Sequence, residues 1–155
     1  MPDTPALNDS RLEGVDYAVS RHGPVASLEE AAELRGVPPS AVIKTMVVRT
    51  KDDAYVFVLV PGDRVIDWAK LRAQVGQRRL SMPDADEALA ATGYKRGTIT
   101  PFGSSTAWPV IADERLTSGV VSIGGGAQGV SITIEGATVA TVLEATLADV
   151  TKPSA

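Results

Sequence analysis

The sequence of 155 residues contains no cysteine and one histidine, His22. The lack of cysteine excludes disulfide bonds, thiol nucleophiles and cysteine metal ligands, and a lone histidine excludes a metal site built from several histidines. No apolar run approaches the roughly 18 residues that a membrane span needs, and residues 1–5 lack the basic and apolar regions of a signal peptide. We therefore expect a cytoplasmic protein without membrane association, metal or cofactor.

The acidic balance of the chain limits its partners. The formal net charge of −4 argues against broad, sequence-independent nucleic-acid binding, but it allows contact with a small part of an RNA through a local basic patch. Two basic groups could form such a patch: Lys95 with Arg96, and a second group of Arg64, Lys70, Arg72, Arg78 and Arg79. Most charges of this kind are solvated, but either group could hold phosphates if it faced the glycine-rich loops.

The length and composition are those of an ordinary globular domain. A chain of 155 residues fits one domain with a real core, and 44% hydrophobic with 22% charged residues is typical of folded proteins. No internal repeat or linker divides the chain. We predict a single domain over residues 1–155, with its core at about residues 15–150 and a loosely held N-terminus.

One charged side chain interrupts an apolar run at residues 41–49, which the pattern predicts to be a strand. Alternation places Lys44 on one face with Met46 and Val48, and the residues between them on the other face. Both faces are mostly apolar, so this strand is expected to be covered on both sides. A lysine there either extends to water at the strand end or points into a lined cavity, where it needs a partner or a function.

Helix starts and stops are clearly marked in the sequence. Ser27 and Glu30 form a capping box ahead of an apolar stripe that stops at Gly36. Asp67 and Asp84 are N-cap candidates of the same kind. The predicted helices cover residues 28–35, 68–75, 85–92 and 137–147.

The remaining apolar segments predict a sheet. Strands are expected at residues 17–20, 41–49, 54–60, 78–82, 108–112, 120–123 and 130–134, with a hairpin-like connection at residues 51–53. Together with the helices, these strands predict a mixed α+β (α/β) fold, in which a partly closed, barrel-like mixed sheet is surrounded by helices.

Two glycine-rich stretches lie between these elements. Residues 93–103 hold three glycines and a proline, and they are predicted to form a shaped loop. The second stretch, residues 124–126, is not followed by the Gly-Lys-Ser/Thr of a Walker loop, and the order of its neighbours excludes a dinucleotide fingerprint. It either forms a tight turn between strands or lets a ligand approach exposed backbone N–H groups.

His22 would have to be the base of any Ser-His-Asp triad. The chain contains no Gly-x-Ser-x-Gly nucleophile elbow to supply the serine. From the residues alone, His22 is interpreted as a turn or surface histidine.

Taken in order, these motifs resemble the YbaK family. The chain carries Ile43-Lys44-Thr45 at a strand start, then Gly93-Tyr94-x-x-Gly97-x-Ile99-Thr100-Pro101-Phe102-Gly103, then Gly124-Gly125-Gly126-x-x-Gly129-Val130-x-Ile132. YbaK proteins are freestanding aminoacyl-tRNA deacylases, similar to the editing domain inserted in bacterial prolyl-tRNA synthetases. The resemblance runs from about Tyr17 to Asp149, and the chain lacks a synthetase's catalytic sequence, so it looks like a freestanding member.

The resemblance also implies the site residues. Lys44 matches the family's functional lysine and is the predicted catalytic residue. The predicted substrate-binding residues are the Gly-x-x-x-Pro loop (Gly97, Thr98, Ile99, Thr100, Pro101), the glycine-rich loop (Gly124, Gly125, Gly126, Gly129), the early His22, and two pocket positions, Ser20 and Ser131. Some members carry Tyr at the position of Ser20 and Asp at that of Ser131, so these departures affect the substrate assignment more than the activity.

The implied reaction is hydrolysis of the ester between a wrong amino acid and the terminal ribose of a tRNA. Water is the nucleophile, and a small amino acid such as Ala, Ser or Cys is the expected substrate. An activated ester needs only a positioned water and a stabilised oxyanion, which glycine-loop N–H groups and the Lys44 cation can supply. The implied partners are the aminoacyl-tRNA acceptor end and, as a further candidate, a synthetase.

Two alternatives stay open at this point. The first is a catalytically silent module of the same fold that binds tRNA or a synthetase, which the departures at Ser20 and Ser131 suggest. The second is a small-molecule ester or amide hydrolase that uses the same pocket.

Overall fold

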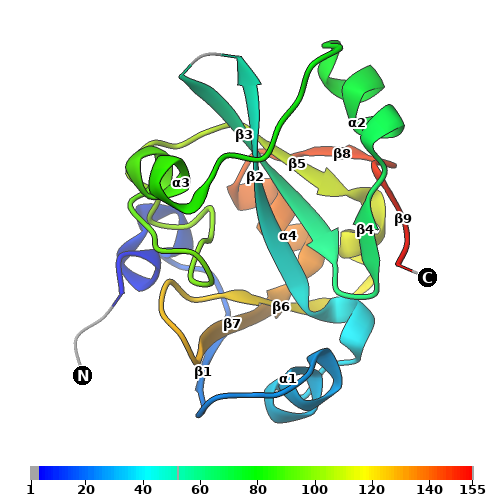
Figure 1. Cartoon of the computed structure of the whole chain (residues 1–155). Coiled ribbons are helices and arrows are strands. Elements are labelled where there is room, and N and C mark those ends of the chain that lie inside the picture. The colour runs from blue at the N-terminus through cyan, green and yellow to red at the C-terminus, as the bar shows by residue number, and fades with distance from the viewer. Residues whose placement is uncertain (1–3, 52, 155) are drawn as a thin grey trace.

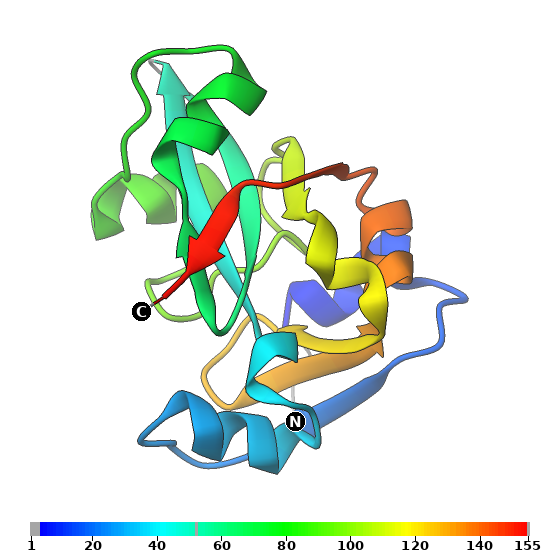
Figure 2. The ribbon, with the colours of Figure 1, turned by 90° about the vertical axis from the view of Figure 1, so that its right-hand side faces the viewer.

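The described part of the chain, residues 4–51 and 53–154 of a computed structural model, forms three β-sheets with four α-helices around them (Figure 1). An antiparallel sheet has the order β1 (Ala18–Arg21), β7 (Val130–Glu135) and β6 (Val120–Gly124). A mixed sheet has the order β2 (Ile43–Lys51), β3 (Ala54–Pro61), β5 (Val110–Asp113) and β8 (Thr146–Ala148). The third sheet pairs β4 (Arg64–Ile66) with β9 (Thr151–Pro153), which lie side by side in Figure 2.

The first three helices begin and end where the sequence predicted. The N-cap side chains of α1 (Leu28–Arg35), α2 (Trp68–Val75) and α3 (Ala85–Thr92) each accept a hydrogen bond from a backbone N–H in the first turn. Each of these helices ends at a glycine in the left-handed conformation, which a glycine adopts without a steric penalty. None of the helices among the described residues is long and apolar enough to cross a membrane.

The four-stranded sheet is buried on both faces, as the pattern at residues 41–49 predicted. Phe57 and Leu59 of β3 belong to a core shared with the β1-β7-β6 sheet. The alternate side chains, among them Val58 and Val60, belong to a second core that α2 covers through Leu71. Because neighbouring side chains enter different cores, a slip of one residue in β2 or β3 would exchange the two sets.

The mixed α+β class is confirmed, but the expectation of a barrel-like core is wrong. Between the described strands of the two larger sheets, the connection is an isolated parallel bridge from Val42 to Ser122. The 3₁₀ turn Pro39–Ala41 directly precedes Val42.

Several local predictions also differ from the structure. Helix α4 covers Gly136–Val142 rather than residues 137–147, because Glu144 takes a positive φ of 52° and the chain turns into β8. The strand predicted at residues 78–82 is a single bridge from Ser81 to Arg49. The three-residue strands β4, β8 and β9 were missed, since they are too short to show an alternation. The predicted connection at residues 51–53 joins β2 and β3, and its Asp52 lies outside the described residues.

The loosely held N-terminus was also a wrong prediction for the described residues. Ala6 and Leu12 are buried in the core shared by the two larger sheets. They lie on two 3₁₀ turns, Ala6–Asn8 and Ser10–Leu12, the second capped by Asp9. Two buried apolar side chains and a cap are enough to fix this segment against the fold.

Candidate active site

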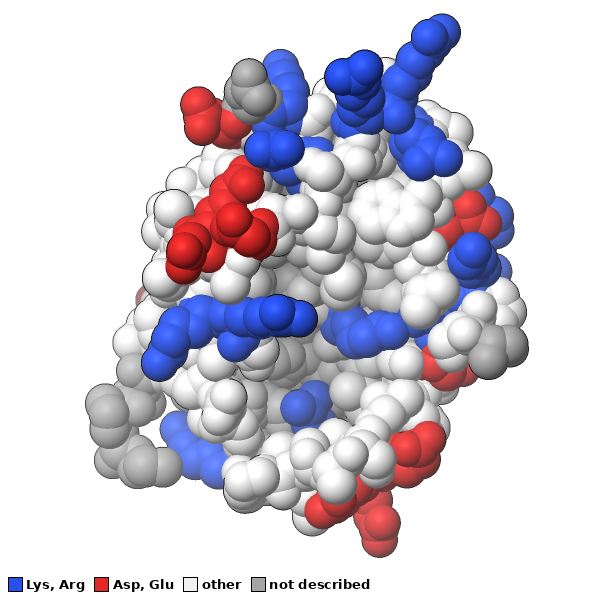
Figure 3. All heavy atoms as spheres, viewed as in Figure 1, with Lys and Arg blue, Asp and Glu red and all other residues white. Residues whose placement is uncertain are grey.

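A cleft of about 650 Å³ runs along the open edge of β2, the outermost strand of its sheet. Figure 3 shows this face with a hollow across its middle and Lys and Arg side chains on both sides of the hollow. The described residues that line the cleft are Arg35 from the end of α1, residues 42–47, residues 82–85 and Ala88 at the start of α3, Arg96, Gly97 and Ile99 from the loop, and Gly124 at the end of β6.

Lys44 lies in this cleft on the face of β2 that also carries Met46. Its ammonium donates a hydrogen bond to the backbone carbonyl of Arg64 on β4. Burial lowers the pKa of the Lys44 ammonium from its ordinary value, and the negative charge of Asp63 opposes part of this shift. Since one N–H meets the carbonyl, two more are left to donate to a ligand.

The backbone of β2 supplies further polar groups to the cleft. Arg49 exchanges both of its backbone hydrogen bonds with Ser81, on the side away from β3. In an antiparallel pair, every second residue points its N–H and C=O in the same direction. Val47 and Thr45 therefore direct these groups away from β3, toward the edge that the cleft follows. A ligand in the cleft meets backbone donors and acceptors as well as side chains.

The loop at residues 93–103 is closed by a buried hydrogen bond, in which the Tyr94 hydroxyl donates to the carbonyl of Phe102 over 2.6 Å. Burial raises the pKa of Tyr94 to about 12, so this phenol stays a donor at neutral pH. Gly97 and Ile99 face the cleft. Thr98 instead lines a neighbouring cavity with Gly126. The loop has the shaped, irregular form that the sequence predicted.

Thr100 and Pro101, the last two residues of the Gly-x-x-x-Pro motif, are buried. The Thr100 hydroxyl has no hydrogen-bond partner among the described residues. A side chain at Gly124 would meet the Thr100 side chain at 4.0 Å and the Ile99 carbonyl at 3.7 Å. The loop and the end of β6 therefore form one continuous wall.

The glycine-rich stretch between β6 and β7 divides into two parts. Gly124 faces the cleft. The Gly125 N–H donates to the Val130 carbonyl across the turn, its carbonyl accepts from the Thr4 hydroxyl, and a side chain there would meet Val130 at 2.6 Å. Gly129 has a φ of 74° and lies against the His22 carbonyl, so only glycine fits. The tight-turn interpretation explains Gly125 and Gly129, and the ligand-approach interpretation applies to Gly124.

The other predicted substrate-binding residues lie outside the set that lines the cleft. His22 contacts the carbonyl of Gly23 through Nδ1 at 2.9 Å, and its Nε2 is buried without a partner in the described structure. Ser20 is opposite Ser131 in the β1–β7 pair, and Ser131 is in turn opposite Gly124. The Ser131 hydroxyl is buried and has no described partner. This pair of serines lies next to the cleft wall rather than on it.

The sequence analysis did not assign three polar side chains of the cleft, Arg35, Thr45 and Asp84, to the site. Arg35 ends α1, where a cation is favourable at the helix C-terminus, so its position gave no reason to expect a site. Asp84 was assigned only as an N-cap, which the structure confirms. Thr45 was quoted only as part of the Ile43-Lys44-Thr45 motif, and its buried hydroxyl has no hydrogen-bond partner within the described residues.

The N-terminal segment braces both loops of the cleft. Asp9 accepts a hydrogen bond of 2.7 Å from the Gly103 N–H, and Arg11 donates to the Pro101 carbonyl at 3.1 Å. The Thr4 hydroxyl donates to the Gly125 carbonyl. Burial alone would raise the pKa of the Asp9 carboxyl, but the hydrogen bonds from Arg11 and Gly103 lower it overall. These contacts fix the two loops relative to each other.

The opposite wall is held by Glu87 of α3. The Tyr55 hydroxyl donates to Glu87 at 2.6 Å, and Arg49 pairs with the same carboxylate at 3.4 Å. The hydrogen bond to Glu87 and burial raise the pKa of Tyr55 to about 12. The start of α3 is therefore fastened to β2 and β3.

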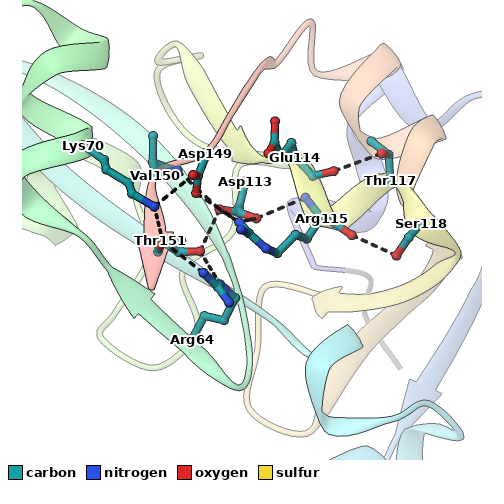
Figure 4. A network of polar contacts seen from close by, with 10 residues as sticks. All are labelled: Arg64, Lys70, Asp113, Glu114, Arg115, Thr117, Ser118, Asp149, Val150 and Thr151. Atoms are coloured by element: carbon teal, nitrogen blue, oxygen red, sulfur yellow. Dashed lines mark hydrogen bonds and ion pairs between the residues drawn. The ribbon is translucent and has the colours of Figure 1, made fainter. Parts of the chain in front are cut away.

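A polar network behind the cleft holds the carbonyl that Lys44 contacts (Figure 4). Asp113 is fully buried and accepts hydrogen bonds from the Thr151 hydroxyl at 2.7 Å and from Arg115 at 3.1 Å. Thr151 in turn accepts from Arg64 Nε at 2.7 Å. Lys70 pairs with Asp149 at 2.9 Å on the outside. Arg64 and Lys70, two members of the second predicted basic group, therefore bind partners within this network.

Comparison with known proteins assigns the chain to a family. A sequence profile of the aminoacyl-tRNA editing domain matches residues 22–142. The proline–tRNA ligase of Thermosipho africanus is 36% identical over 80 residues, which are 52% of this chain and 14% of the ligase. A candidate Cys-tRNA(Pro)/Cys-tRNA(Cys) deacylase of Enterococcus faecalis, EbsC, is 25% identical over 126 residues, covering 81% of this chain and 77% of EbsC.

The fold has a close structural relative. The crystal structure of a candidate trans-editing enzyme for prolyl-tRNA synthetase has a TM-score of 0.84 to this chain at 22% identity. The similarity covers 98% of this chain and 99% of that one.

Because the profile spans most of its length, the chain belongs to the aminoacyl-tRNA editing domain family. This confirms the YbaK resemblance.

Proposed function

We propose that this protein removes a small, wrongly attached amino acid, such as Ala, Ser or Cys, from a mischarged tRNA. The observation that carries the proposal is that Lys44, Gly97 and Gly124 open onto one cleft, although they lie far apart in the sequence. The family assignment supports the reaction class, and the name of EbsC supports cysteine as one substrate to test. A cytoplasmic location and a single-domain organisation stay predictions.

The chemistry needs no covalent intermediate. The oxygen of a water molecule bonds to the ester carbonyl carbon, and the bond from that carbon to the ribose oxygen breaks. The ribose oxygen takes up a proton, so the products are the free amino acid and the uncharged tRNA. The neighbouring ribose hydroxyl activates the water, as the family resemblance implies.

Two groups in the cleft are suited to the negative charge that develops on the carbonyl oxygen. The Lys44 ammonium has N–H groups beyond the one that contacts Arg64. The backbone N–H groups of Thr45 and Val47 are directed to the cleft edge. Preorganised donors of this kind need no rearrangement during the reaction.

The RNA partner is supported by a second hollow that continues the first. This basic hollow is lined by residues 49–51 and 77–81, which include Arg49, Lys51, Arg78 and Arg79. It adjoins the cleft along β2 and along the segment from Ser81 to Met82. Figure 3 shows several Lys and Arg side chains at the top of the molecule. An acceptor stem whose end enters the cleft would place its phosphates there.

The test is a deacylation assay over a panel of mischarged tRNAs that carry alanine, serine or cysteine. We expect Lys44→Ala to lower the rate constant by about a hundredfold or more, the usual effect of removing one preorganised charge. Lys152→Ala is the matched control, because Lys152 of β9 is exposed and lines neither the cleft nor the basic hollow. Equal rates for wild type and Lys44→Ala would remove Lys44 from the mechanism, and no hydrolysis by the wild type would reject the proposal.

A second candidate is a silent binding module of the same fold, favoured by Ser20 and Ser131, which by the family resemblance stand where some members carry Tyr and Asp. This candidate predicts binding of uncharged tRNA or a synthetase without turnover of any ester. The same panel separates it from the hydrolase. Faster hydrolysis of free aminoacyl esters than of charged tRNA would instead indicate a small-molecule esterase.

A further inference from the structure

Arg35 has few polar contacts for a guanidinium in its position. It is half-buried at the end of α1 and lines the cleft. Its Nη1 donates a long hydrogen bond of 3.4 Å to the Ser122 hydroxyl. Its Nε is buried without a partner among the described residues. A guanidinium has five N–H donors, so most of this group's capacity is unused.

Two other arginines in the described structure meet better acceptors. Arg11 pairs with Asp9 at 2.7 Å, and Arg115 pairs with Asp113 and with Asp149, both at 3.1 Å. No ion pair between described residues involves Arg35. Burial lowers the pKa of the Arg35 guanidinium, and no neighbouring anion opposes this shift. Removing a cation from water without a partner is unfavourable. The position of Arg35 is explained if a ligand supplies the missing anion.

The charge of the cleft agrees with an anionic ligand. Its described lining residues include three cations, Arg35, Lys44 and Arg96, and a single carboxylate, Asp84. The carboxylate of Asp84 already accepts a hydrogen bond from the Glu87 N–H at 2.8 Å. An excess of positive charge in a partly enclosed hollow attracts negatively charged groups.

We propose that Arg35 binds an oxyanion of the substrate. The proposal rests on the function proposed above and adds a residue and a ligand group to it. The oxyanion that agrees with a small amino acid is the phosphodiester next to the terminal ribose, and the side-chain carboxylate of an acidic amino acid on the tRNA is the alternative source that the test below distinguishes. Both present two oxygens to the planar fork of a guanidinium, which binds such pairs in a bidentate manner. The contact with the fully buried Ser122 orients the fork.

Lys44 does not replace Arg35 in this role. Its ammonium is held at the carbonyl of Arg64, on β4, whereas Arg35 is held at Ser122, on β6. The two cations are therefore held by contacts to different sheets. A substrate can place its reacting ester near one and an anionic group near the other.

The test is binding of non-hydrolysable mimics, namely short RNA hairpins that end in CCA and carry an amino acid through an amide on the last ribose. Three mimics are compared: an alanyl form, an aspartyl form, and an alanyl form with a methylphosphonate in place of the last phosphodiester. We expect Arg35→Met to bind the mimics that carry the contacted oxyanion roughly tenfold to a hundredfold more weakly than the wild-type protein does. Arg72→Met is the matched control, since Arg72 lies in the last turn of α2, exposed and away from the cleft.

The three mimics identify the source of the oxyanion. If it is the phosphodiester, Arg35→Met weakens both natural-backbone mimics equally and leaves the methylphosphonate form unaffected. If it is a carboxylate, the loss is confined to the aspartyl mimic. Arg35→Lys, which keeps the charge but not the fork, should recover part of the affinity. Urea unfolding of each variant excludes a loss of fold as the cause.

Wild-type affinity in Arg35→Met for every mimic would overturn the proposal, as would a wild type that binds none of them. Because binding is measured without turnover, this result is independent of the deacylation assay. Arg35-dependent binding without hydrolysis would reject the proposed reaction and support the role of Arg35. Hydrolysis by the wild type together with binding that does not depend on Arg35 would support the proposed reaction and reject the role of Arg35.

Discussion

Two groups of charged residues lie on either side of the Lys44 side chain, and they are built differently. In the network around Asp113, the cations have acceptors at short distances, including Arg64 with Thr151 at 2.7 Å and Arg115 with Asp113 at 3.1 Å. In the cleft, Arg35 meets a single hydroxyl at 3.4 Å. Buried polar groups are normally paired. The paired charges of the network therefore stabilise the fold, whereas the weakly paired Arg35 of the cleft is suited to binding a ligand.

Lys44 joins the two regions. Its ammonium donates to the carbonyl of Arg64, and the guanidinium of Arg64 is fixed by Thr151 of β9. The network thus sets the position of the predicted catalytic cation without taking part in the cleft. If this comparison is correct, substitutions in the network should lower stability, whereas substitutions in the cleft should lower binding or activity alone.

The largest effect is expected for Asp113→Ala. This change leaves the Thr151 hydroxyl and the Val150 N–H without their acceptor in a buried place, and breaking a buried polar pair from one side costs about 3 kcal/mol or more. Urea unfolding measures the loss. Thr117→Ala, at the exposed edge of the network in Figure 4, should change stability by less than about 0.5 kcal/mol. A small effect at Asp113 would contradict its structural role.

Arg78 and Arg79 of the basic hollow form no ion pair with another described residue. Substituting them shows whether such cations also bind a ligand outside the cleft. We expect the double variant Arg78→Ala/Arg79→Ala to bind tRNA about tenfold more weakly, and its affinity to depend less steeply on salt, because each lost phosphate contact lowers that slope by about one. Arg72→Ala/Lys152→Ala removes the same charge outside both hollows. Equal weakening in the two double variants would show a general charge effect instead.

The N-terminal brace is expected to contribute less, and its contribution depends on pH. The folded pKa of Asp9 lies below its ordinary value of 3.8, so its carboxylate stabilises the fold above that pH and the contribution is lost as the pH falls below it. Asp9→Asn should cost about 1 kcal/mol at pH 7, and the difference from wild type should shrink as the pH falls below about 4. Unfolding curves at several pH values measure this. A difference that grows toward acid pH would contradict the assignment.

The smallest change in stability is expected for Arg35→Met. Since the guanidinium has no ion pair among the described residues, replacing it with an apolar side chain of similar length should leave the free energy of unfolding within about 0.5 kcal/mol of wild type. Urea unfolding beside the Asp113→Ala variant gives the direct comparison. A loss of several kcal/mol would show that Arg35 has a structural role like that of the network.

Most of the fold could be predicted because its signals are local. The capping side chains Ser27, Asp67 and Asp84 and the glycines after the helices fixed three helices almost to the residue. The long strands β2 and β3 carry enough alternation to be recognised. The short strands β4, β8 and β9 carry no such signal, because three residues take their structure from the neighbours with which they pair.

The candidate site could be predicted only where motifs mark it. Lys44, Gly97 and Gly124 were found through the family resemblance, and the fold brings them to one cleft. Arg35 carried no motif, and Ser20 and His22 were expected at the substrate but do not line the cleft. Which side chains share a cleft depends on distances between elements remote in the sequence.

The sequence by itself determined the family, the positions of the first three helices and the long strands, and the lysine near the start of β2, since caps, periodicity and motifs act over a few residues. Only the tertiary structure decided how the charges are used. Arg64 and Arg35 are indistinguishable as letters in the chain. One is fixed by Thr151 within the network of the fully buried Asp113, and the other faces a cleft with most of its donors free. The cost of removing a charge from water depends on its three-dimensional surroundings, and these exist only in the folded chain.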